Sequence, residues 1–118
     1  MMKQYLLVNT DLNMSIGKTA GQAAQAGIAY ARAAQASSEK NERVEEWQAM
    51  HGMREVVVGM GEEEMLSTMV RLKEDGISFA VVVDSGMTEV PRSSMTVIAI
   101  EPLTRQECPR WFKRWRTL

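Results

Sequence analysis

Cysteine is nearly absent from this chain of 118 residues, and no long apolar run or strong excess of one charge is present. The single Cys108 cannot form an internal disulfide, which favours a reducing compartment, and we expect a cytoplasmic location. No apolar stretch approaches the roughly 18 residues of a transmembrane helix, and the apolar run Tyr5–Val8 is too short for a signal peptide. We therefore expect no membrane partner. A net charge of −1 gives no bulk attraction for nucleic acid.

The chain also has few of the side chains on which metal and thiol chemistry depends. His51 is the only histidine and has no second His or Cys nearby, so we expect a helix-end residue and no metal site. Cys108 has no histidine partner close in sequence and precedes Pro109, which argues against a thiol nucleophile. The composition is otherwise that of a globular protein, with 45% hydrophobic and 25% charged residues.

Short β-branched runs alternate with helical segments along the whole chain. This alternation predicts one α/β domain over residues 1–118, a three-layer α/β/α sandwich with a mixed four-stranded sheet. The predicted strands are Gln4–Val8, Glu55–Gly59, Phe79–Val83 and Met95–Ile100. Helices are expected from Gly17 to about Ala36, from Glu39 to about Met50, from Glu62 to Asp75, and as a short C-terminal helix within Thr104–Arg116.

The stretch from Phe79 to Pro102 contains two apolar strands joined by a polar loop that begins Asp84-Ser85-Gly86. Asp84 follows the last residue of the first of these strands, where open α/β sheets usually bind ligands. The alternative is that Asp84 only caps the turn before Gly86, as Asp-x-Gly sequences usually do. If the chain has a reactive site, we expect Asp84 to lie at its centre.

A second candidate is Gly17-Lys18-Thr19 at the start of the first long helix. Helix N-termini attract anions, and Lys18 adds a mobile positive charge. A nucleotide P-loop would need glycine at position 12, which is leucine here, so that motif is absent. The alternative is a glycine turn with an exposed lysine. Gln22 and Gln25 share a helical face with Lys18, however, and form a polar stripe on an alanine-rich helix.

The C-terminal tail interleaves aromatic and basic residues. Such a pattern fits RNA binding by stacking and charge, and it also fits a segment that packs its aromatic rings on the sheet. We favour packing. Trp111 and Trp115 are therefore expected to be at least half buried, with Arg110 and Arg114 directed outward.

Taken in order, short groups of residues resemble a known family over nearly the whole chain. They are Lys3–Val8 followed by Thr10–Leu12 and Met14; Gly17-Lys18 with Ala20 and Gln22; Trp47, Gly52 and Val56–Val58; Asp84, Gly86 and Thr88; and Thr96-Val97 with Pro102. The family is that of the type-II peptidyl-tRNA hydrolases, typical of archaea and eukaryotes.

The resemblance implies hydrolysis of the ester bond between a peptide and the 3′ end of tRNA. Its implied catalytic residues are Lys18, Asp84 and Thr88. Asp84 would orient or deprotonate the attacking water, Lys18 would neutralise the oxyanion or hold a phosphate, and Thr88 would position water or substrate. The implied substrate-binding residues are Gly17, Gln22, Gln25, Gly86 and Arg92. The implied partner is tRNA, with no metal or organic cofactor, and a homodimer is left open.

Several positions depart from the family pattern. Ile16, Gln25, Glu55 and Gly59 stand where basic residues are common, and the turn after the aspartate reads Pro91–Ser94. Each lost phosphate contact weakens tRNA binding. Two alternatives therefore stay open: a non-catalytic RNA- or protein-binding module of the same fold, and a hydrolase of a smaller ester or amide. If the site is real, the Lys18 ammonium and the Asp84 carboxylate should lie within roughly 4–8 Å of each other.

Overall fold

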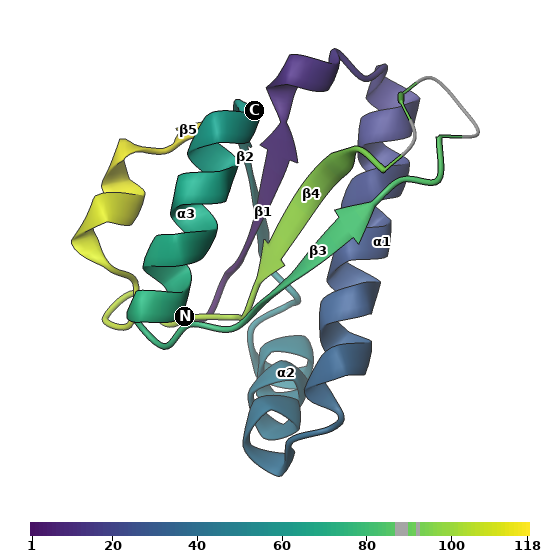
Figure 1. The fold of residues 1–118 in the computed structure, drawn as a ribbon. Coiled ribbons are helices and arrows are strands. Elements are labelled where there is room, and N and C mark those ends of the chain that lie inside the picture. The colour runs from purple at the N-terminus through teal and green to yellow at the C-terminus, as the bar shows by residue number, and fades with distance from the viewer. Residues whose placement is uncertain (87–89, 92) are drawn as a thin grey trace.

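The computed structural model describes residues 1–86, 90–91 and 93–118. Within these residues, one mixed sheet contains five strands in the order β3-β4-β1-β2-β5 (Figure 1). β1 and β2 pair in parallel, and the other neighbouring strands pair antiparallel. The strands are β1 (Gln4–Asn9), β2 (Glu55–Met60), β3 (Phe79–Val83), β4 (Met95–Ile100) and β5 (Arg116–Thr117).

Helices connect the strands along the chain, and a serine side chain caps the N-terminus of each of the first two α-helices. The described residues form three α-helices, α1 (Ile16–Ala34), α2 (Ser38–Met50) and α3 (Glu62–Glu74). The α1 cap is Ser15, whereas α2 is capped by Ser37, which accepts a hydrogen bond from the Lys40 N–H. The described residues also include two short 3₁₀-helices, η1 (Thr10–Leu12) and η2 (Arg110–Arg114). None of these described helices has the length and apolarity to cross a membrane.

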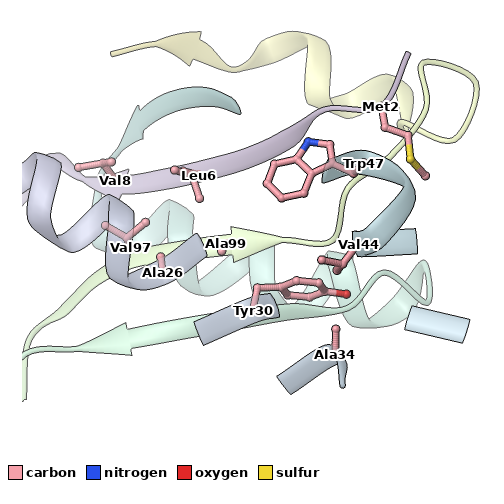
Figure 2. Packing of buried hydrophobic residues seen from close by; sticks show 10 residues of the cluster. All are labelled: Met2, Leu6, Val8, Ala26, Tyr30, Ala34, Val44, Trp47, Val97 and Ala99. Atoms are coloured by element: carbon pink, nitrogen blue, oxygen red, sulfur yellow. The ribbon is translucent and has the colours of Figure 1, made fainter. Parts of the chain in front are cut away.

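Alternating side chains on the strands divide the core between the two faces of the sheet. Leu6 and Val8 of β1 point toward α1 and α2, where Tyr30 and Trp47 are buried against them (Figure 2). Leu7, between them in sequence, joins the cluster on the side of α3. Figure 1 shows α1 and α3 on opposite sides of the sheet. The site described below lies on the α1 side.

The predicted fold is wrong in two respects at the C-terminal tail. The expected C-terminal helix is only the short η2, and the chain then becomes extended and adds β5, so the sheet has five strands and not four. β5 is only two residues long and pairs with Val58 and Gly59 of β2, so it has no periodic sequence pattern of its own. The α/β class with a mixed sheet is confirmed.

Aromatic packing explains why the tail turns away from helical geometry. The rings of Phe112 and Trp115 stack with centroids 4.0 Å apart, and Tyr5 of β1 meets both rings edge-on. Trp111 and Trp115 are partly buried in the cluster on the α3 side, as expected. Arg110 and Arg114 are exposed, also as expected.

Candidate active site

Asp84 lies at the end of β3, and both its backbone N–H and its backbone C=O form hydrogen bonds with the segment that precedes β4. Its N–H donates to the Ser94 carbonyl and its own carbonyl accepts from the Ser93 N–H, each at 2.9 Å. One side-chain oxygen, Oδ2, accepts from the Gly86 N–H at 2.8 Å. Gly86 has a φ of 81°, which favours glycine at that position. Asp84 therefore does cap the turn, and it does so with one oxygen only.

The other oxygen of Asp84 binds Lys18. Lys18 lies in the first turn of α1, where its N–H donates to the Ser15 hydroxyl at 3.1 Å. Its Nζ is 2.8 Å from Asp84 Oδ1, and the two side chains are only 13% and 9% exposed. This separation is shorter than the expected roughly 4–8 Å. The sequence-based expectation that two residues 66 positions apart face one another is therefore met.

The electrostatics of the pair follow from its position. A lysine in the first turn opposes the positive end of the helix dipole, and the carboxylate of Asp84 compensates both charges. The hydrogen bond from Lys18, followed by that from the Gly86 N–H, holds the pKa of Asp84 below its ordinary value. Asp84 is therefore ionised at neutral pH. A carboxylate with a lowered pKa is a weak base, which favours orienting a water over removing its proton.

Gln22 connects this pair to the sheet. It is buried, and its Nε2 donates to Gln25 Oε1 at 2.9 Å and lies 3.4 Å from Asp84 Oδ1. Its carbonyl oxygen accepts a hydrogen bond from the hydroxyl of Thr96, which is fully buried in β4. The amide of Gln22 is thus fixed at both ends, and its NH₂ group is shared between Gln25 and the Asp84 carboxylate.

Thr96 also belongs to the site, which the sequence analysis did not predict. Val82 pairs with Val97 while Val83 pairs with Met95, so Thr96 is an extra residue in β4. Such a bulge redirects a side chain, here toward Gln22. The available signal was a hydroxyl residue inside the otherwise apolar run of β4.

The other predicted site residues divide into three groups. Gln25 is exposed and lines a groove of about 530 Å³ together with Asp84. Gly17 is exposed in the first turn of α1, and nothing lies within 4 Å of the point where a Cβ would be. Thr88 and Arg92 lie outside the described residues.

Residues 1–86, 90–91 and 93–118 contain no group of three or more His, Cys, Asp or Glu side chains placed to hold a metal ion. Burial raises the pKa of the Cys108 thiol. The described part of the site therefore offers an ion pair, an oriented amide and a hydroxyl. This set of groups suits the attack of water on a carbonyl carbon.

Comparisons with known proteins agree with this chemistry. A protein-family model described as Peptidyl-tRNA hydrolase PTH2 matches residues 2–118. A peptidyl-tRNA hydrolase of Staphylothermus marinus is 35% identical over 100 residues, covering 85% of this chain and 81% of that protein. One of Methanopyrus kandleri is 35% identical over 112 residues, covering 93% and 92%. A probable peptidyl-tRNA hydrolase 2 of Dictyostelium discoideum is 31% identical over 104 residues, covering 88% of this chain and 49% of that protein.

Proposed function

Because this chain belongs to the PTH2 family of peptidyl-tRNA hydrolases, its activity is the hydrolysis of peptidyl-tRNA, and we propose that Lys18 and Asp84 carry that reaction. The observation that supports the assignment is their ion pair of 2.8 Å at the end of β3. Both side chains are largely shielded from water, which strengthens their charge interactions. No feature of the described residues favours a non-catalytic module or a hydrolase of smaller esters.

The proposed reaction begins with a water that donates a hydrogen bond to the Asp84 carboxylate. Attack of its oxygen on the ester carbonyl forms a tetrahedral oxyanion, and collapse breaks the bond to the ribose oxygen. The water's proton passes to that leaving oxygen, so the products are a peptide with a free carboxyl group and tRNA with a free 3′-terminal hydroxyl. Lys18 stabilises the negative charge as it develops on the carbonyl oxygen.

The remaining site residues act on this pair or on the substrate. Gln22 keeps the carboxylate oriented, supported by the hydrogen bond from Thr96. Gln25 contacts the substrate in the groove beside Asp84. Thr88, from the family resemblance, positions the water or the substrate. Gly17, Gly86 and Arg92 complete the proposed substrate-binding set.

The proposal also includes the domain organisation, the location and the partner that the sequence predicts. A single domain with three layers is supported by the two separate hydrophobic clusters on the faces of the sheet. A cytoplasmic location is supported by the single cysteine. The partner is tRNA, and the oligomeric state is left open between monomer and homodimer.

A turnover assay on a defined peptidyl-tRNA, with the corresponding aminoacyl-tRNA beside it, tests the assignment. Asp84→Asn keeps the shape of the side chain but removes the charge that orients the water and holds Lys18, and should lower turnover by about 10²-fold or more. Its affinity for tRNA should hold or rise, because a charge that repels phosphate is lost. Glu63→Gln removes an equal charge from an exposed residue of α3 and serves as the matched control. Turnover by Asp84→Asn at the rate of this control would reject the catalytic assignment.

A further inference from the structure

β3 forms one end of the sheet, and no described segment pairs with its outer edge. Natural edge strands are usually protected from pairing by charged residues, proline or a bulge on that strand. β3 has the sequence Phe-Ala-Val-Val-Val and carries neither charge nor proline. The extra residue of the nearby bulge belongs to β4, not to β3. The edge that leads directly into Asp84 is therefore open to another extended chain.

The hydrogen bonds to β4 show which backbone groups face outward. The Glu101 N–H donates to the Ser78 carbonyl, and the Asp84 N–H donates to the Ser94 carbonyl, so residues 78 and 84 face β4. Groups alternate along an antiparallel strand. The N–H and C=O groups of Phe79, Val81 and Val83 therefore point away from β4 and toward the open edge.

A groove of about 530 Å³ follows this edge on the side of α1. Its walls come from the outer surface of α1 and from the last residues of β3 with the loop that follows. Ile28 and Val83, which line the groove, are 61% and 57% exposed. Its lining includes Gln25, Ile28 and Arg32 of α1 and Val81, Val83 and Asp84 at the end of β3.

We propose, building on the function proposed above, that the peptide portion of peptidyl-tRNA binds as an added strand along the open edge of β3. The polarity of the strand supports this occupant. β3 runs toward Asp84, and the ester to be cleaved lies at the carboxyl end of the peptide. A peptide that lies parallel to β3 therefore brings its last carbonyl to Lys18 and Asp84, whereas an antiparallel peptide would bring its amino end there.

This mode of binding suits a substrate whose peptide varies in sequence. Main-chain hydrogen bonds supply affinity whatever the side chains are. β3 spans five residues, so an added strand gains contacts over about 15 Å, at roughly 3.3 Å per residue. Peptides longer than this strand should gain no further affinity. A second copy of the chain could occupy the same edge, but its backbone would bring no scissile carbonyl to Asp84.

The test compares tRNAs that carry one N-acetylated residue with tRNAs that carry a five-residue peptide. Val81→Pro removes an outward N–H without removing a bond to β4, and Val81→Ala shortens the side chain while keeping that N–H. We expect Val81→Pro to lower kcat/KM for the long substrate about fivefold to tenfold, the effect of one hydrogen bond. The short substrate should change by less than about twofold on the same scale. Val81→Ala, which keeps the N–H, should lower kcat/KM for the long substrate by less than Val81→Pro does, and an equal loss would assign the effect to the side chain.

Modified substrates provide a second test, which does not depend on whether a protein variant folds. N-methylation of successive peptide bonds should lower kcat/KM at alternate positions only, because alternate groups of an added strand face β3. Equal kcat/KM for short and long peptides, or no alternation, would overturn the added strand and leave the hydrolase function standing. A shift from dimer to monomer in Val81→Pro with unchanged kinetics would also overturn it, and would assign the edge to a second copy. Absence of hydrolysis by the wild-type protein on every substrate would reject both proposals.

Discussion

Replacing Thr96 by valine tests whether the buried hydrogen bond behind the site is important for stability. The two side chains have nearly the same shape, so the change removes one hydroxyl and creates no large cavity. Thr96 is fully buried and Gln22 is only 6% exposed, so water cannot easily replace the lost donor. The carbonyl oxygen of Gln22 would then be buried without the partner it has in the native protein.

The expected cost follows from that unsatisfied oxygen. Leaving a buried polar group without its hydrogen bond typically costs about 1–3 kcal/mol, whereas removing both partners can be nearly neutral. Thr96→Val should therefore lower the free energy of unfolding by about 1–2 kcal/mol. For a chain of this size, that corresponds to a decrease in Tm of roughly 5–10 °C. A released Gln22 should also lower kcat several-fold, with little change in KM.

Urea unfolding of four proteins measures the effect: wild type, Thr96→Val, Gln22→Met and the double variant. The double variant should be more stable than the sum of the single changes predicts, by about 1 kcal/mol, because it leaves no buried oxygen unsatisfied. Thr96→Val with wild-type stability, or strictly additive changes, would refute the reasoning.

Three further predictions concern groups outside the site. Asp11 accepts a hydrogen bond from the Glu62 N–H and caps α3, so Asp11→Ala should cost about 1 kcal/mol in urea unfolding and Asp11→Asn clearly less; equal losses would contradict the cap. Burial raises the pKa of Glu55 from 4.5 to about 7, so its charging costs stability as pH rises through that range. Glu55→Gln should gain up to about 1 kcal/mol at pH 8, because the residue is exposed and solvent limits the effect, and almost nothing at pH 4, below the ordinary pKa; a pH-independent gain would exclude this cause. The hydrogen bonds from Arg43 lower the pKa of Glu107 from 4.5 to about 2. The charged Glu107 therefore stabilises the fold above pH 4.5, and this stabilisation is lost as pH falls toward 2. Arg43→Ala should flatten this acid dependence of Tm, and an unchanged profile would show that another group causes it.

The regular elements could be predicted because their signals are local. The apolar runs at Phe79–Val83 and Met95–Ile100 place β3 and β4 where the structure has them. The first long helix is predicted to start at Gly17, and α1 starts one residue earlier, at Ile16. These elements depend on periodicity and on capping within a few residues.

Features that depend on distant parts of the chain could not be predicted. β5 forms because the rings of Phe112 in η2 and of Trp115 after it pack beside Tyr5 and bring the tail against β2. Asp11 caps a helix that starts 51 positions later, and no local pattern indicates that partner. The closeness of Lys18 and Asp84 was expected through family resemblance, while the role of Thr96 depends on a bulge whose register only the structure shows.

The central claim is that Lys18 and Asp84 act as one catalytic unit on peptidyl-tRNA. A double-mutant cycle with Lys18→Met, Asp84→Asn and the double variant tests it, with single-turnover cleavage of one defined peptidyl-tRNA as the measured rate. Each single change should slow cleavage by about 100-fold or more, and the double variant should be about as slow as the slower single variant. A double variant whose rate loss equals the product of the two single losses would contradict a joint action of Lys18 and Asp84. A single variant that cleaves within about twofold of the wild-type rate would contradict a catalytic role for that residue.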